Sequence, residues 1–115
     1  MIDYHKTLKD TLNAILPTHY EMVLKSGYKT PCLSYMELNN AVEAEGNTIG
    51  YSNIIYQVKV WDNDIANIQK YVLLVDKAMR SIGFKRIGST ELYDYNSTMI
   101  QKVLTYEALA LEEYN

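Results

Sequence analysis

The spacing of apolar residues predicts two amphipathic helices. The first covers residues 3–16 and stops at Pro17, which cannot continue a helix. The second follows Asp62 or Asp64, either of which can cap it, and ends at Gly83, because glycine tolerates the left-handed exit conformation. The apolar stripe of the first helix is Tyr4, Leu8, Leu12 and Ile15, and that of the second is Ile65, Ile68, Val72, Val75, Met79 and Ile82.

Five segments have the pattern of β-strands. The clearest is "IIYQVKVWD" (54–62), where Tyr56, Val58 and Val60 alternate with Gln57, Lys59 and Trp61, so that one face belongs to the core. The other four are "HYEMVL" (19–24), "PCLSYMEL" (31–38), "FKRIGSTELYDY" (84–95) and "TMIQKVLTYEALAL" (98–111). The last two are expected to pair through a turn at residues 94–97.

The predicted order of elements is α-β-β-β-α-β-β. Each helix has a single apolar stripe, so both are expected on one face of a mostly antiparallel sheet of four to five strands. The fold class is therefore α+β, a two-layer sandwich formed by one domain over residues 1–115. The second face of the sheet, which carries Gln57, Lys59 and Trp61, is left for solvent or for a partner.

Residues 39–51, "NNAVEAEGNTIGY", lack a helical stripe and contain two glycines and two glutamates. We expect them to form an extended arm or a long hairpin loop, mobile in the free protein and ordered against a neighbouring subunit. Its contact residues are expected to be Asn39, Asn40, Val42, Ile49 and Tyr51, with Glu43 and Glu45 setting the register or facing a lumen.

Length and composition are those of one ordinary globular domain. The chain has 115 residues, of which 48% are hydrophobic and 22% are charged. No segment approaches the roughly 20 apolar residues that span a bilayer, so no membrane association is expected. The polar N-terminus has no hydrophobic signal region, and the one cysteine cannot form an internal disulfide, so we expect synthesis in a cytoplasm.

The distribution of charge is uneven although the net charge is only −3. No Lys or Arg lies between Lys29 and Lys59, whereas Arg80, Lys85 and Arg86 form a basic cluster. A solvated surface is the ordinary explanation of such segregation, and patches that meet across a repeated subunit interface are the alternative. A dedicated nucleic-acid interface is disfavoured, because it normally needs a basic face. The eleven tyrosines suit surfaces that are buried against another protein.

Candidate catalytic chemistry is sparse. Cys32 is the only thiol, and a reactive cysteine needs a nearby base, for which the histidines are His5 and His19. Neither spacing is typical of a Cys–His pair, so we interpret Cys32 as a small buried apolar residue. The sequence has no zinc motif, no complete calcium loop and no glycine-rich phosphate loop. We therefore expect neither a cofactor nor a metal, and no enzymatic activity.

Four stretches together resemble a known family. They are "TPCLSYMELNN", "YSNIIYQVKVWDNDIANIQKY", "IGFKRIGSTELYD" and "MIQKVLTYEAL". Their order is similar to that of the tail terminator proteins of long-tailed bacteriophages and prophages, also called tail-completion or head-to-tail joining proteins. The resemblance runs from the first helix to about Leu109. It rests on a P-x-x-x-Y strand, a strand that ends in Trp-Asp before a helix, and a Gly-Phe exit from that helix.

The resemblance implies a structural role in the virion. Proteins of this family form a hexameric ring that sits on the finished tail tube, ends its polymerisation and joins the tail to the connector under the capsid. The implied partners are other copies of the chain, the tail tube protein and the head-side connector or stopper protein. Genomic DNA passes through the lumen without specific binding, and the implied location is the head-proximal end of the tail, after assembly in the host cytoplasm. The family has no catalytic residues to carry over.

Two alternatives stay open. Another head–tail connector component, such as a stopper or minor capsid protein, has a similar size and composition. A small cytoplasmic ligand-binding domain is the alternative from a different class, and it predicts a deep pocket lined by polar residues.

Overall fold

The computed structural model describes residues 4–20, 29–44, 49–94 and 98–113, and at 40–44, 49–52, 94 and 110–113 it describes the backbone alone. The elements are α1 (His5–Asn13), β1 (Thr18–Tyr20), β2 (Cys32–Ala44), β3 (Ile49–Asp62), α2 (Ile65–Ser81), β4 (Lys85–Asp94) and β5 (Met99–Glu113). The predicted order and the α+β class are confirmed.

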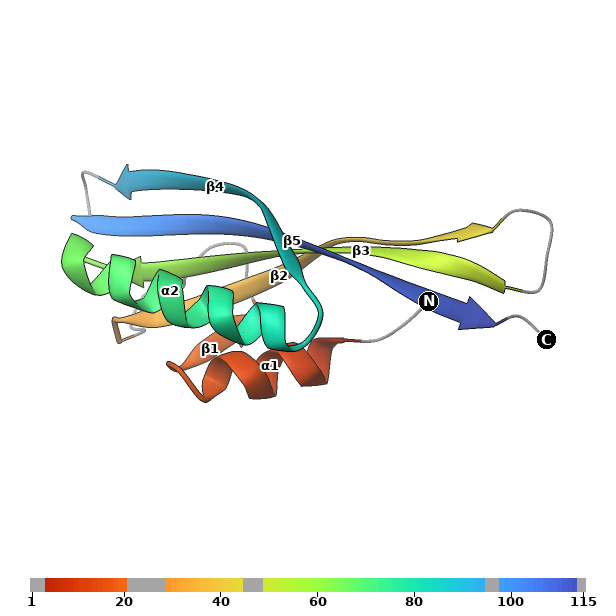
Figure 1. Cartoon of the computed structure of the whole chain (residues 1–115). Coiled ribbons are helices and arrows are strands. Elements are labelled where there is room, and N and C mark those ends of the chain that lie inside the picture. The colour runs from red at the N-terminus through yellow and green to blue at the C-terminus, as the bar shows by residue number, and fades with distance from the viewer. Residues whose placement is uncertain (1–3, 21–28, 45–48, 95–97, 114–115) are drawn as a thin grey trace.

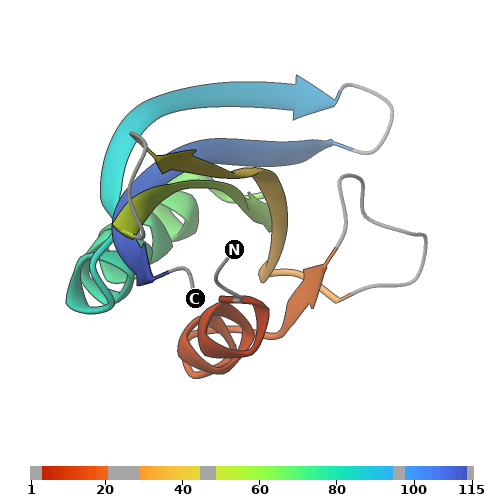
Figure 2. The same ribbon diagram turned by 90° about the vertical axis from the view of Figure 1, so that its right-hand side faces the viewer.

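The five strands form one sheet in the order β1-β2-β3-β5-β4, as Figure 1 shows. The short β1 pairs with β2 in parallel, and every other neighbouring pair is antiparallel. Both helices lie on the same side of the sheet, which curves over them in the view of Figure 2. The predicted two-layer arrangement is therefore correct.

The hydrophobic core lies between the helices and one face of the three central strands. Because side chains alternate along a strand, the even-numbered residues of β3 from 54 to 60 and of β5 from 104 to 108 point toward the helices, as do Leu33 and Tyr35 of β2. The buried residues of this core are Leu8, Leu12 and Leu16 from the first helix region, Ile68, Val72, Val75 and Met79 from α2, Phe84 between α2 and β4, and Leu33, Tyr35, Ile54, Tyr56, Val58, Val60, Leu104, Tyr106 and Ala108 from the sheet.

The ends of α2 follow the predicted chemistry. The Asp64 carboxylate accepts a hydrogen bond from the Ala66 backbone N–H at 2.9 Å, so Asp64, and not Asp62, caps the helix. Gly83 has a φ of +94°, as expected for the glycine at a helix exit. Helix α1 is shorter than predicted and ends at Asn13, although the Leu16 N–H still bonds to the Leu12 carbonyl.

The two central strands are longer than the sequence indicated. Residues 39–44 belong to β2 and residues 49–51 belong to β3, so of the two alternatives for this segment the loop is wrong, and the described residues are extended strand. Their backbones pair with each other from Asn40–Ile54 to Ala44–Gly50. Glu45 lies outside the described residues, as do residues 21–24 of the strand that was expected at 19–24.

A bend separates the body of the sheet from a narrow extension. The register of β2 with β3 shifts at Leu38, and that of β4 with β5 shifts at Ile87, so both strands carry a β-bulge. The two bulges lie beside one cross-strand row, formed by Glu37, Tyr56, Tyr106 and Arg86. Bulges bend a strand and increase its twist, which accounts for the change of direction of the ribbons in Figure 1.

Beyond this bend three strands continue alone, and we call them the extension: residues 39–44 of β2, 49–55 of β3 and 107–113 of β5. Neither helix covers them in Figure 1. The molecule is accordingly long and narrow, with dimensions of 51 × 23 × 22 Å.

Candidate functional site

The extension has two strand edges without a neighbour in the described part of the chain. Strand β1 pairs with β2 only as far as Tyr35, and β4 begins at Lys85, opposite Glu107 of β5. The outer edges of residues 36–44 and 108–113 therefore present backbone N–H and C=O groups outward. Such edges are templates for pairing with another chain, and natural proteins usually shorten or cover them.

The extension is acidic. Its three strand segments contain Glu43, Glu107, Glu112 and Glu113 and no Lys or Arg. The register places Glu112 opposite Gly50 and Glu113 opposite Ile49, while Glu43 pairs with Tyr51, one step away. Three of the four glutamates therefore lie near the far end of the extension.

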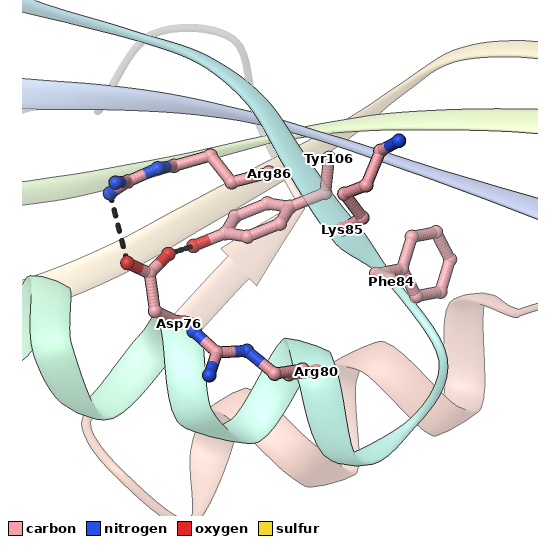
Figure 3. A pocket seen from close by; sticks show the side chains of 6 residues that line it. All are labelled: Asp76, Arg80, Phe84, Lys85, Arg86 and Tyr106. Atoms are coloured by element: carbon pink, nitrogen blue, oxygen red, sulfur yellow. Dashed lines mark hydrogen bonds and ion pairs between the residues drawn. The ribbon is translucent and has the colours of Figure 1, made fainter.

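The predicted basic cluster surrounds a hollow at the base of the extension, where α2 ends and β4 begins. The hollow has a volume of about 430 Å³. Figure 3 shows the six residues that line it, which we call the basic hollow: Asp76, Arg80, Phe84, Lys85, Arg86 and Tyr106. The structure thus brings the three predicted cations Arg80, Lys85 and Arg86 together.

Asp76 neutralises one of these cations. Its Oδ2 atom lies 2.9 Å from Nη1 of Arg86, and its Oδ1 atom accepts a hydrogen bond from the Tyr106 hydroxyl (Figure 3). Burial, together with the charge and hydrogen bond of Asp76, raises the pKa of Tyr106, so this hydroxyl remains neutral and donates. Sequence reasoning missed Asp76 and Tyr106, because neither belongs to a recognisable motif.

Arg80 and Lys85 keep uncompensated charges. Both are exposed, and within the described residues neither forms an ion pair. Glu107 stands opposite Lys85 in the β4–β5 register, yet no ion pair joins them. With Asp76 set against Arg86, the lining of the basic hollow carries two formal positive charges in excess.

Cys32 is fully buried, as predicted. Burial, reinforced by the negative charge of Asp62, raises the pKa of its thiol to about 11. A reactive cysteine has the opposite setting, exposed and with its pKa lowered. The geometry therefore favours the interpretation of Cys32 as a packing residue.

Trp61 is not open to a partner, contrary to expectation. It does lie on the face of the sheet that the helices leave uncovered, but only 7% of it is exposed. Its indole N–H donates a 2.8 Å hydrogen bond to the buried hydroxyl of Ser34, and the Lys59 ammonium lies 5.6 Å from the ring centre. Contacts from Ser34 on the neighbouring strand β2 and from Lys59 on the same strand therefore accompany the burial of the ring.

The imidazole of His5 lies among tyrosine rings at the other edge of the sheet. Its ring centre is 4.9 Å from that of Tyr20 and 5.7 Å from that of Tyr56, both edge-on. Its Nε2 atom is 3.2 Å from the Glu37 carboxylate. These contacts connect α1 to β1, β2 and β3, so His5 has a structural role in joining the helix to the sheet.

The residues predicted to make contacts in the arm are backbone-paired strand residues. Asn39, Asn40, Val42 and Glu43 lie on β2, and Ile49 and Tyr51 lie on β3. The Asn39 side-chain amide donates a 2.9 Å hydrogen bond to the Asn53 carbonyl, which holds the two strands together at the base of the extension.

In the ranges that the structure describes, no three His, Cys, Asp or Glu residues lie close enough to hold a metal ion together. None of the helices described there has the length and apolar content needed to cross a membrane. Comparison of the chain with protein-family profiles gives no match, and a search of curated proteins also gives none.

Proposed function

We propose that this protein is a tail terminator: a ring-forming structural protein that caps the tail tube of a long-tailed bacteriophage and joins it to the head connector. The observation that carries the proposal is the extension, a three-stranded ribbon that has two unpaired edges and no covering helix in the part of the chain that the structure describes. Such a ribbon contributes little to the stability of an isolated subunit. In a ring, neighbouring copies can cover the edges of the ribbon.

The motifs behind the resemblance occupy structurally distinct positions. Pro31 and Tyr35 frame the start of β2, Trp61 and Asp62 end β3, and Gly83 follows α2. In this structure Tyr35 and Trp61 are buried, Asp62 is buried beside the start of α2, and Gly83 has a positive φ. Each motif position therefore has a physical reason to hold that residue, which supports a shared architecture for chains with this pattern.

The electrostatic character of the chain fits a channel for DNA. The net charge is −3, and the extension, the part that projects from the body, has no Lys or Arg. A lumen lined by such a surface neutralises few phosphates, so DNA slides through it without being retained.

Deletion of the gene in the phage or prophage that encodes it tests the proposal. Loss of a tail terminator leaves tube polymerisation unchecked, so electron microscopy should show tails of irregular, excessive length and heads without tails. Antibody labelling of wild-type particles should mark the head-proximal end of the tail. Tails of normal length in the deletion strain would refute the proposal. Co-purification with a portal adaptor but not with the tail tube would instead assign the protein to the head side of the connector.

A further inference from the structure

A groove runs along α2 on the side that faces β4. One half of it is the basic hollow, and the other half is a second hollow of about 350 Å³. Arg86 lines both hollows, and its ion pair with Asp76 crosses from β4 to α2 where they adjoin (Figure 3). We call the two hollows together the α2–β4 groove. The second hollow is lined by Ile68, Gln69, Val72 and Leu73 from α2, by Arg86, Ser89 and Glu91 from β4, and by Lys102 from β5.

The groove is positively charged in a chain that is negative overall. Its lining contains four basic and two acidic side chains, so two positive charges are in excess, whereas the net charge of the chain is −3. A partner that complements this charge is acidic. The basic side chains are Arg80, Lys85, Arg86 and Lys102, and the acidic ones are Asp76 and Glu91.

Two of the four cations are available to a partner. Arg86 is paired with Asp76, and Lys102 has Glu91 opposite it in the β4–β5 register. Arg80 and Lys85 are exposed, and within the described residues neither forms an ion pair. The excess charge of the groove is therefore concentrated at its basic hollow.

The other half of the groove offers an apolar contact. Leu73 is 70% exposed, the highest value for a large apolar side chain in the described ranges. A single exposed leucine is ordinary on a protein surface, but this one lines a hollow together with the buried side chains of Ile68 and Val72. Arg80 follows Leu73 by about two helical turns, or roughly 10 Å along the axis of α2.

We infer that the α2–β4 groove binds an acidic segment of another protein, with an apolar side chain of that segment against Leu73 and a carboxylate on Arg80 and Lys85. A guanidinium can bind both oxygens of a carboxylate at once. In an extended segment the apolar residue and the acidic residue are three or four positions apart, because each residue spans about 3.4 Å. The inference goes beyond the proposed tail role and does not depend on it.

Nucleic acid fits this groove less well than an acidic peptide. Its backbone carries a phosphate charge at every nucleotide. Phosphates that follow the groove would meet the carboxylates of Asp76 and Glu91, and Leu73 offers them no favourable contact. A peptide can place its carboxylates at the basic hollow and an apolar side chain at the second hollow.

A short synthetic peptide and its uncharged twin test the assignment. The first is acetyl-Gly-Leu-Ser-Gly-Glu-Glu-Gly-amide, and the second has glutamine at both glutamate positions. Two adjacent glutamates are used because neighbouring side chains of an extended peptide face opposite sides, so one of them faces the groove in either orientation. In an NMR titration at low salt, the Glu peptide should bind about three-fold to ten-fold more tightly than the Gln peptide and should shift the amide signals of Leu73, Arg80 and Lys85.

Two variants separate the two halves of the groove. Arg80→Gln with Lys85→Gln should weaken the Glu peptide about three-fold to ten-fold and leave the Gln peptide unchanged, because only the carboxylate contact is lost. Leu73→Ser should weaken both peptides by the same factor. All three side chains are exposed, so the variants should keep the fold, which their NMR spectra check. As a matched control, Lys9→Gln with Lys29→Gln removes two exposed lysines outside the groove and should bind both peptides as the wild type does.

The inference is overturned if the wild type binds neither peptide, if it binds both equally, or if the Arg80/Lys85 variant still prefers the Glu peptide. A Leu73→Ser variant that binds both peptides as tightly as the wild type would also overturn it. Tighter binding of a short duplex DNA than of the Glu peptide, lost in the Arg80/Lys85 variant, would assign the groove to nucleic acid instead. The proposed function is tested separately by the tail phenotype. If tails are capped and no peptide binds, the tail role stands and the groove assignment fails, and the reverse result has the opposite meaning.

Discussion

Tyr56 and Tyr106 lie directly opposite each other on β3 and β5, and both are buried at the point where the body of the sheet meets the extension. The Tyr56 ring centre is 5.9 Å from that of Phe84, edge-on, and the Tyr106 hydroxyl reaches Asp76 on α2. These rings close the hydrophobic core under the C-terminal end of α2. Among the described residues, the core continues as far as Ile54 and Ala108, at the base of the extension.

The first prediction concerns the link between this core and the basic hollow. Tyr106→Phe removes the hydroxyl that donates to Asp76 and should lower the free energy of unfolding by about 1.5 to 3 kcal/mol, as for a hydrogen bond to a charged group. Arg86→Met should lower the free energy of unfolding less, because the Arg86 side chain is 42% exposed and water screens its ion pair with Asp76. Urea denaturation of both variants checks the order.

The double substitution Lys6→Ala with Asp10→Ala is the control for these measurements. This pair also lies within ion-pair distance, at 2.6 Å, but on the exposed surface of α1. It should change stability much less than Tyr106→Phe. Equal losses in the two variants would show that the Asp76 hydrogen bond contributes nothing beyond a surface contact.

The second prediction concerns the only tryptophan. Ser34→Ala leaves the buried indole N–H of Trp61 without its acceptor and should destabilise the protein by about 1 to 3 kcal/mol. Trp61→Phe together with Ser34→Ala removes both partners, so it should cost less than the sum of the single changes. Fluorescence of the native protein should be blue-shifted and should move to the red on unfolding. A native spectrum typical of exposed indole would contradict the observed burial.

The third prediction concerns Cys32. Replacement by Ala should lower stability by about 1 to 2 kcal/mol and leave assembly intact at permissive temperature. Labelling by a thiol reagent at neutral pH should be slow in the native protein and fast in urea, because the thiol is buried and protonated. Loss of function with an unchanged melting temperature would contradict the packing role.

The pH dependence of this site has a definite sign. Folding raises the pKa of Cys32 from 9.0 to about 11, so the folded state holds the proton more tightly than the unfolded state. The contribution of the protonated thiol to stability is present in full below pH 9 and is lost as the pH rises toward 11. The wild type should therefore lose its stability advantage over Cys32→Ala in this interval, as measured by denaturation at a series of pH values.

The parts of the fold that sequence predicted are those with local causes. The stripe of α2 has no interruption, Asp64 and Gly83 mark its ends, and β3 alternates cleanly from Tyr56 to Trp61. Strand residues 39–44 were missed because their cause is not local. They pair with β3, and β3 pairs with β5 along its other edge. This pairing stabilises the strand in spite of the asparagines, alanines and glycines in this stretch.

The candidate site divides in the same way. The cluster of Arg80, Lys85 and Arg86 is visible in the sequence because its members are close along the chain. The role of Asp76 was not visible in the sequence, because only the packing of α2 against β4 and β5 brings Asp76 beside Arg86 and Tyr106. The exposure of Trp61 was also misjudged, because alternation along one strand says nothing of how far the neighbouring strands cover a ring.

The last prediction concerns the extension. The shortened variant lacks residues 42–52 and has Ala41 joined to Asn53 by an Asn-Gly turn, so that Ala41 and Asn53 still pair in the observed register. Its chain ends after Leu109, the residue of β5 that lies opposite Asn53. Because Tyr56, Tyr106 and the helices are untouched, the body should fold with nearly unchanged cooperativity, as measured by thermal unfolding. Ring formation and head joining should nevertheless be abolished, because the outer part of both unpaired edges and the acidic end are gone. The Lys6→Ala/Asp10→Ala variant should assemble normally. A shortened protein that still caps tails and yields infectious particles would show that the extension has no part in assembly, and a shortened protein that fails to fold would show that the body depends on it.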